Sequence, residues 1–278
     1  MKKLLLLLLL LPLFVACSGE IKISANLAEP TLNKPSSVDW VYDATISDEF
    51  EGSTLDTTKW YDHNPHWLGR EPSWFYDKNV VIRDGSLILM GKREELENLP
   101  EAYHTFTSAA VQSKDTVLYG FFEIRCRAMD SALSSAFWLY VQDSLKQEEI
   151  DIFEICGRND VDRSYEHTYF ATSHYMLKTI DVHISDHVAY KTPYRLAEEM
   201  IVAGLEWNRQ EIIWYVNGEE IRRRKNDYWH SPQTINFDSE AFPTWWGLPS
   251  ESDNGGEFEI EYFRYWSSPE LYQHIYRD

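Results

Sequence analysis

Hydrophobic and polar positions alternate over short stretches along most of this chain, with the period of two that is typical of β-strands. Two pairs of these stretches flank dipeptides that form tight hairpin turns. Asp84-Gly85 separates Val80–Arg83 from Ser86–Met90, and Asn217-Gly218 follows the apolar run Ile212–Val216. We therefore predict a β-hairpin at each of these two positions.

The remaining pattern is also rich in strands and poor in helices. Further strands are predicted over residues 120–129, 135–141 and 256–266, and single helical turns near 96–101 and 269–274. The chain shows no internal repeat, no alternation of strands with long helices, and no Pro/Gly-rich linker after residue 40. This order of short strands and turns predicts an all-β sandwich in one domain.

The most unusual stretch reads Glu149-Ile150-Asp151-Ile152-Phe153-Glu154, three carboxylates interleaved with strand-forming apolar residues. Alternation places Glu149 and Asp151 on one face of a strand, but Glu154 on the other. A β-bulge at Ile152-Phe153 would return Glu154 to the first face, and bulges are common beside active sites. We therefore predict a bulge here, with Ile150 and Ile152 in the core.

The spacing of these carboxylates indicates a catalytic pair. Four strand steps separate the backbones of Glu149 and Glu154 by about 13 Å, and inward-leaning side chains leave about 5–6 Å between their carboxyl groups. Retaining glycosidases hold two carboxyl groups about 5–5.5 Å apart, whereas inverting enzymes need about 6.5–9.5 Å. Asp151 between them would push the two pKa values apart, leaving one Glu ionised and the other protonated. A solvated acidic strand face, with or without a structural metal, is the alternative interpretation.

The same hexapeptide resembles the signature of glycoside hydrolase family 16 in its bulged form, Glu-aliphatic-Asp-x-x-Glu. Other stretches resemble this family in the same order along the chain: 47–60, 79–87, 119–125, 134–139 and 206–218. The resemblance implies a β-jelly-roll of two stacked antiparallel sheets, the concave one forming a substrate cleft. It also implies that Glu149 is the nucleophile, that Asp151 assists and that Glu154 is the acid/base.

Two stretches are similar to family members that act on red-algal galactans, the agarases, porphyranases and κ-carrageenases. They are Trp245-Trp246-Gly247-Leu248-Pro249 and Ser134-Ser135-Ala136-Phe137-Trp138. Phe153 also favours the members that act on galactans, because laminarinase-type members more often carry Met at this position. The resemblance thus implies a retaining endo-β-glycosidase that hydrolyses a galactan. The first alternative is a β-1,3- or mixed-linkage β-glucanase, and the second is a non-catalytic surface glycan-binding protein or a structural adhesin.

An extended sugar chain binds a concave sheet by stacking on flat aromatic rings and by hydrogen bonding to polar side chains. The candidate substrate-binding residues carry such groups in stretches expected near the catalytic strand: Trp67, Arg70, Trp74, Trp138, His174 and Trp246. Each of these residues also has a purely structural interpretation. The rings would then pack in the core, and Arg70 would form a surface ion pair. His183 and His187, at i and i+4, lie in a stretch without helical pattern and are not expected to bind a metal.

Composition narrows the class of partner. A formal net charge of -19 argues against nucleic acids and anionic membrane surfaces, which attract basic proteins. The 11 Trp, 17 Tyr and 13 Phe residues suit both a core and a sugar-binding cleft. Cys126 and Cys156 are expected on opposite strand faces, which predicts free thiols rather than a disulfide. We expect a monomer whose partner is the polysaccharide.

The resemblance also raises a question about a metal. Family members often bind a structural calcium on the convex side through an acidic residue of the final strand, usually Asp. This chain has Glu259 and Glu261 there. The departure leaves a structural calcium open, and we expect no cofactor or metal to be required for catalysis.

The N-terminus has the pattern of a bacterial lipoprotein signal. Lys2-Lys3 precedes an unbroken leucine run, Leu4–Leu11, which is too short to span a membrane. Val15-Ala16-Cys17 then resembles a cleavage site at which Cys17 is lipidated; an ordinary signal peptide is the alternative. We expect residues 1–17 to form the signal, 18–36 a flexible tether and 37–278 the catalytic domain. The protein is thus predicted to be secreted and anchored by its lipid in the cell envelope, at the outer membrane or cell surface.

Overall fold

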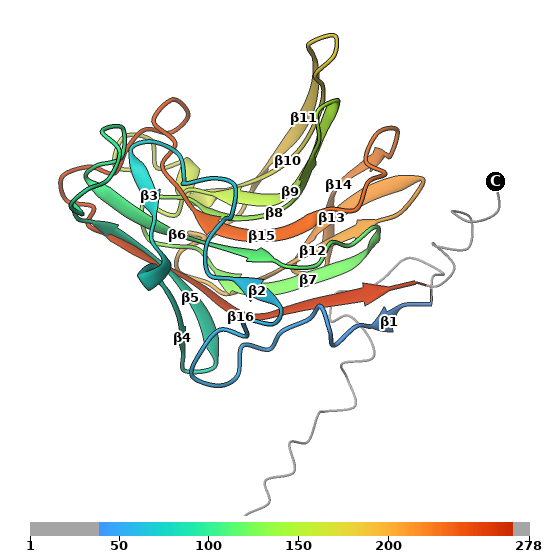
Figure 1. The fold of residues 1–278 in the computed structure, drawn as a ribbon, viewed down its shortest axis with the longest axis horizontal. Helices are drawn as coiled ribbons and strands as arrows, with labels where there is room; N and C mark the ends of the chain where they lie inside the picture. The colour runs from blue at the N-terminus through green and yellow to red at the C-terminus, as the bar shows by residue number, and fades with distance from the viewer. Residues whose placement is uncertain (1–38, 269–278) are drawn as a thin grey trace, which may run out of the picture.

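The computed structural model describes residues 39–268. The expected signal, the tether and the helical turn near 269–274 lie outside these residues. Within them, two layers of strands pack face to face, and the upper layer in Figure 1 curves away from the lower one. The long strands pair antiparallel, and a parallel pairing joins the short strand β3 to β6. This arrangement confirms the predicted sandwich of two antiparallel sheets.

The concave layer has the strand order β11-β10-β9-β8-β15-β6. Its bounds are β6 (Phe106–Ser113), β8 (Ser135–Gln142), β9 (Lys146–Ile155), β10 (Thr168–Leu177), β11 (Val182–Lys191) and β15 (Thr234–Ser239). The hairpin of β10 and β11 rises steeply at the end of this layer (Figure 1). This layer therefore forms a curved sheet on one side of the sandwich.

The second layer has the order β5-β16-β7-β12-β13-β14 and joins the first through β5 and β6. Its bounds are β5 (Ser86–Arg93), β7 (Gly120–Arg127), β12 (Ile201–Trp207), β13 (Glu211–Val216), β14 (Glu219–Lys225) and β16 (Gly255–Ser267). Short strands complete the edges: β1 (Val41–Tyr42), β2 (Trp60–Tyr61), β3 (Ser73–Phe75) and β4 (Val80–Arg83). The strands predicted over 120–129, 135–141 and 256–266 correspond to β7, β8 and β16, and are confirmed.

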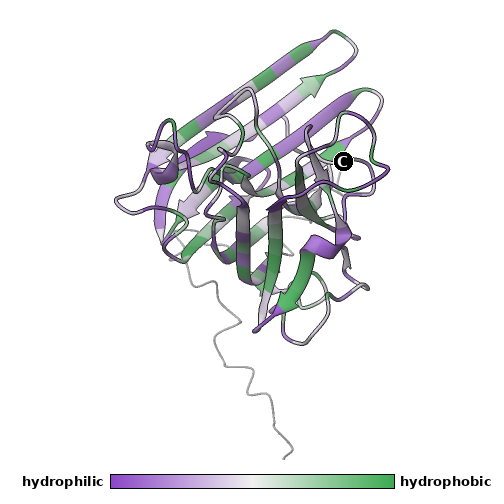
Figure 2. Ribbon diagram, turned by 90° about the vertical axis from the view of Figure 1, so that its left-hand side faces the viewer, coloured by the Kyte–Doolittle hydropathy of each residue, from purple (hydrophilic) through white to green (hydrophobic). Residues whose placement is uncertain are grey.

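The core lies between the two layers, where each strand contributes every second side chain. Bands of hydrophilic and hydrophobic residues follow one another along the strands in Figure 2. Ile150, Ile152 and Phe153 of β9 are fully buried in this core, as is Cys126 of β7. Cys156 lies in a separate apolar cluster, and both cysteines are free thiols. The predicted absence of a disulfide between them is confirmed.

Both predicted hairpins form. Their turn residues have positive φ angles, 54° and 76° at Asp84-Gly85 and 49° and 85° at Asn217-Gly218. Two consecutive positive φ angles are the requirement of the type I′ turn, which Asp-Gly and Asn-Gly satisfy at low cost.

The helical turn predicted near 96–101 is wrong. The segment forms turns, and Asn98 has a φ of 66°, which no right-handed helix contains. Its helix-forming residues are too few, because one turn fixes several backbone angles in return for one hydrogen bond. The helices of the described residues are two short 3-10 turns, η1 (Asp77–Asn79) and η2 (Tyr165–His167). None of the helices in residues 39–268 is long and apolar enough to cross a membrane.

Candidate active site

Strand β9 carries one extra residue at the predicted position. The consecutive residues Phe137 and Trp138 of β8 pair with Phe153 and Asp151, so that Ile152 is left without a partner. The register between β9 and β10 shifts at the same place. Ile152 and Phe153 both point into the core, where each is fully buried. The predicted β-bulge is therefore confirmed.

The bulge returns Glu154 to the concave face, beside Glu149 and Asp151. The three carboxylates line a first cavity of about 500 Å³ over β8 and β15. A second cavity, of about 580 Å³, lies over β10 and β11. Four residues line both: Arg70, Gln147, Glu149 and Glu154. The two cavities together, here called the cleft, therefore extend to either side of the two glutamates.

Sheet register decides what lies beside each carboxylate. Across β8, β9 and β10 the concave rows are Tyr140–Glu149–His174, Trp138–Asp151–Thr172 and Ala136–Glu154–Phe170. Ala136 also pairs with Asp238 of β15 on its other side. Glu154 and Asp238 therefore flank Ala136 in the same row of the sheet.

The backbone beneath the carboxylates is held from the core side. The indole N–H of Trp214 donates to the carbonyl oxygen of Asp151 over 2.9 Å. The indole N–H of Trp229 is shared between the carbonyl oxygens of Glu149 (2.9 Å) and His174 (3.0 Å). These carbonyls belong to β9 and β10 at the level of the bulge, so the two tryptophans fix the strands that present the carboxylates.

Two arginines of β14 complete this support. The guanidinium of Arg222 lies 4.3 Å from the ring centre of Trp214, and that of Arg224 lies 4.3 Å from the ring centre of Trp229. Arg222 also donates to the carbonyl of Ala171 over 3.0 Å. These two arginines therefore lie beneath strands β9 and β10 and are not wholly exposed to solvent.

The cleft floor concentrates negative charge. Burial is the largest cause that raises the pKa of Glu149 to about 7 and that of Glu154 to about 8, and the charge of Glu240 raises the latter further. Burial and the neighbouring charges of Glu149 and Glu154 hold the pKa of Asp151 well above its usual range. Both glutamates therefore hold a proton to higher pH than an exposed glutamate does, as a carboxyl group that acts as a general acid requires.

Arg70 is the guanidinium closest to this acidic group. Its Nε donates to Glu240 over 2.6 Å, and its guanidinium lies 4.4 Å from the ring centre of Phe242. Glu240 is buried, whereas the side chain of Arg70 is 46% exposed. The residue thus lines the cleft and at the same time neutralises a buried carboxylate.

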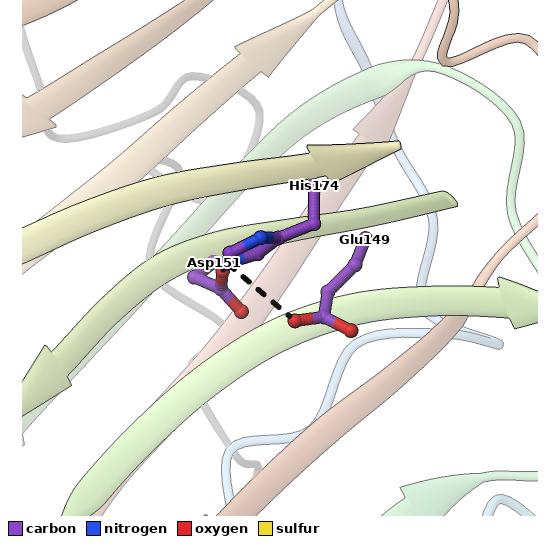
Figure 3. A group of neighbouring side chains, drawn as sticks. All are labelled: Glu149, Asp151 and His174. Carbon is purple, nitrogen blue, oxygen red and sulfur yellow. Dashed lines mark ion pairs between the residues drawn. The ribbon is translucent and has the colours of Figure 1, made fainter. Parts of the chain in front are cut away.

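His174 faces the carboxylates from β10 (Figure 3). Its Nε2 lies 3.6 Å from Asp151 Oδ2 and 4.0 Å from Glu149 Oε1. Its Nδ1 lies 3.1 Å from Nε2 of His183 on β11. Burial, with the neighbouring His183 next in importance, lowers the pKa of His174 to about 4, so the imidazole is neutral near neutral pH.

The predicted tryptophans separate into three groups. Trp67 and Trp138 line the first cavity and meet edge to face, with ring centres 6.4 Å apart. Trp74 lines neither cavity and packs against Tyr103 instead. Trp246 is buried and donates its indole N–H to the carbonyl of Ala132, so it does not line the cleft either. The structure thus brings only Trp67 and Trp138 of these four to the carboxylates.

Several cleft residues were not predicted as such from the sequence: Glu240, Trp245, and His183 and His187 beside His174. Trp245 is 37% exposed and lines the second cavity, where its ring centre lies 4.8 Å from that of Phe170. The alternation Asn236-x-Asp238-x-Glu240 was a usable signal, because it marks one polar strand face. Nothing in the local sequence distinguishes the exposed Trp245 from its buried neighbour.

The two acidic residues considered for a structural calcium already have cationic partners. Glu259 pairs with Arg127 and Glu261 with Arg125, so each carboxylate is already neutralised by a guanidinium. Calcium takes about six to eight oxygen ligands that are free to coordinate, so these residues do not fit it. Among the described residues, one group has metal-ligand spacing, Glu149, Asp151 and His174.

The arrangement suits one kind of chemistry. Two partly buried carboxyl groups, both with raised pKa values, stand at the junction of two cavities, on a strand that buried tryptophans support. Such a pair can attack an electrophilic carbon and protonate the departing oxygen of a bond lying between them.

Comparison with known proteins agrees with this chemistry. The family described as "Beta-porphyranase A-D, GH16 domain" matches residues 40–267. The β-porphyranase D of Zobellia galactanivorans is 36% identical over 146 residues, which are 48% of this chain and 34% of that protein. The κ-carrageenase of Pseudoalteromonas carrageenovora is 25% identical over 276 residues, 86% of this chain and 67% of that one.

A solved structure shares the fold. The crystal structure of porphyranase B from Zobellia galactanivorans has a TM-score of 0.76 and 22% identity, covering 86% of this chain and 97% of that chain. The match to the β-porphyranase D sequence spans only about a third of that longer protein.

Proposed function

This chain belongs to the glycoside hydrolase family 16 domains of the β-porphyranase A–D type, and we propose that it is a retaining endo-glycosidase of red-algal galactans. One observation carries the activity: the bulge in β9 sets Glu149, Asp151 and Glu154 on one face, at the junction of two cavities. Because the cleft continues on both sides of these carboxylates, it suits an internal bond of a long chain.

The proposed reaction gives the two glutamates different protonation states, as the family resemblance implies. The ionised Glu149 attacks the anomeric carbon, while the protonated Glu154 donates its proton to the departing glycosidic oxygen. The resulting glycosyl-enzyme ester on Glu149 is then hydrolysed by a water that Glu154 deprotonates. Two displacements at one carbon restore the original configuration. Asp151 between the two glutamates holds the proton balance of the pair.

The neutral His174 has a role in the same scheme. Its ring stands over Asp151 and Glu149 without carrying a positive charge near neutral pH. It therefore adds no positive charge beside the nucleophile, and it can form a hydrogen bond with a sugar hydroxyl.

The galactan substrate is supported by the relatives, which include several β-porphyranases and a κ-carrageenase. A glucan endo-1,3-β-glucosidase of Niallia circulans also matches, at 24% identity. A reducing-end assay across porphyran, agarose, κ-carrageenan, laminarin and lichenan tests the choice. Release of reducing ends from a galactan alone is expected. Release from laminarin or lichenan alone would identify a β-glucanase, and a glycan that binds but is never shortened would identify a binding protein.

We also propose that the chain is a monomeric lipoprotein of the cell envelope, held by a lipid on Cys17. The support is the leucine run and the Val15-Ala16-Cys17 sequence, which lie outside the described residues. Growth with a labelled fatty acid should label the wild type and not the Cys17→Ala variant. Label in both proteins, or in neither, would contradict this proposal.

A further inference from the structure

Two carboxylate oxygens and one imidazole nitrogen lie close together on the floor of the cleft. Glu149 and Asp151 of β9 and His174 of β10 each offer one metal-ligand atom, and these atoms lie within 4.8 Å of one another. Figure 3 shows the imidazole turned toward both carboxyl groups. The separations from His174 Nε2 are 3.6 Å to Asp151 and 4.0 Å to Glu149.

One of these atoms lacks a hydrogen-bond partner. Asp151 is 4% exposed, and its Oδ2 is buried without a hydrogen-bond donor in reach. A buried carboxylate oxygen without a donor is costly unless a proton or a cation satisfies it. The nearest polar atom is Nε2 of His174, which presents a lone pair in one of its two neutral tautomers.

One of the two neutral tautomers of His174 presents the lone pair that a metal needs. If Nδ1–H of His174 donates to Nε2 of His183, 3.1 Å away, the lone pair on Nε2 of His174 faces the carboxylates. Gln147 donates to Glu149 Oε2 over 3.1 Å and leaves Oε1 free. Histidines that ligate a metal usually donate their other N–H in this way, and ligating carboxylates are likewise hydrogen bonded.

We propose that Glu149, Asp151 and His174 form a binding site for a Zn²⁺-class transition-metal ion, which blocks the cleft reversibly. Ligand bonds of about 2.0–2.1 Å in a tetrahedral site place ligand atoms about 3.4 Å apart, close to the separations observed here. Imidazole with carboxylates suits zinc, whereas calcium and magnesium prefer oxygen alone. The cavity supplies the open fourth position.

A bound zinc ion would therefore inhibit the enzyme whichever polysaccharide is its substrate. Zinc on Glu149 occupies the oxygen that would attack the anomeric carbon, so an occupied site cannot form the glycosyl-enzyme. Because the site is a property of the free protein, its binding test stands even if the proposed galactan activity is wrong.

Isothermal titration of the metal-free protein with ZnCl₂ at pH 7.5 tests this site. One ion per chain is expected. His174→Ala and Glu149→Gln should each weaken binding by more than about tenfold, and His183→Ala by about tenfold through its hydrogen bond. His187→Ala, on the same strand and outside the ligand set, should keep the wild-type affinity. Circular dichroism checks that each variant is folded.

Two results would overturn the proposal. The first is wild-type protein that takes up no zinc at millimolar concentration. The second is binding that survives His174→Ala but is lost in His187→Ala, which would place the ion on the histidines of β11.

Discussion

The indole N–H of Trp229 donates to the carbonyl oxygen of Glu149 over 2.9 Å, from the core side of strand β9. The same N–H reaches His174 on the next strand. Trp229 therefore ties two cleft residues to one buried ring, without itself lining the cleft. We regard it as a positioning residue for Glu149.

Trp229→Phe removes this N–H and keeps most of the ring. The loss of a buried hydrogen bond should lower the free energy of unfolding by about 1–3 kcal/mol. We also expect kcat to fall about tenfold with little change in KM, because the position of Glu149 changes whereas the contacts with the substrate do not. Trp60→Phe, which removes a buried indole N–H from Asp48 far from the cleft, is the matched control. Equal kcat losses in the two variants would mean that Trp229 is only structural.

The two glutamates should respond differently to replacement by alanine. Each variant should lose about 10³-fold or more in kcat on the galactan with the fold intact. With an activated aryl glycoside and added azide, Glu149→Ala should yield the α-glycosyl azide, since azide attacks from the face that Glu149 leaves empty. Glu154→Ala should yield the β-glycosyl azide, since the glycosyl-enzyme still forms. The opposite pairing of products would exchange the two roles.

The pH dependence of kcat/KM should be bell-shaped, with its maximum between the pKa values of about 7 for Glu149 and about 8 for Glu154. Activity falls below this range as Glu149 takes up a proton, and above it as Glu154 loses one. Glu240→Gln removes a negative charge that raises the pKa of Glu154, so the basic limb should move to lower pH. Glu123→Gln, a buried carboxylate of β7, should leave the limb in place. A basic limb that stays fixed in Glu240→Gln would contradict this electrostatic account.

Trp245 and Trp246 are adjacent in sequence, but replacing them should change different properties: substrate binding for Trp245 and stability for Trp246. Trp245→Ala removes a ring that lines the second cavity, so KM for the polysaccharide should rise several-fold, consistent with about 0.5–1.5 kcal/mol for an aromatic contact. Trp246→Ala empties a buried site and should cost about 3–5 kcal/mol of unfolding free energy. Thermal denaturation and initial rates measure both. An unchanged KM in Trp245→Ala would remove it from the substrate path.

Local chemistry made much of this architecture predictable. The hairpins at Asp84-Gly85 and Asn217-Gly218 follow from the φ angles that these dipeptides tolerate. The bulge follows from a single conflict, because Glu154 reaches the face of Glu149 only if β9 holds one extra residue. These features depend on a few neighbouring residues, and so they can be predicted from the sequence.

Features that depend on distant contacts were not predictable in the same way. Whether Trp245 or Trp246 meets the cleft is decided by packing against Ala132 and Phe170, which are remote in sequence. The support of Trp229 under Glu149 joins residues 80 positions apart. Strand β11 is exposed along much of its length, and its pairing with β10 holds it in the sheet.

The anomeric configuration of the first product reports how Glu149 and Glu154 act on the glycosidic bond. Proton NMR can follow the new reducing ends while the enzyme digests a β-linked galactan. A double displacement at the bulged strand predicts that the β-anomer appears first and that the α-anomer grows only as the sugar mutarotates. If the α-anomer appears first, the two carboxylates lie too far apart for a glycosyl-enzyme, and the account is wrong.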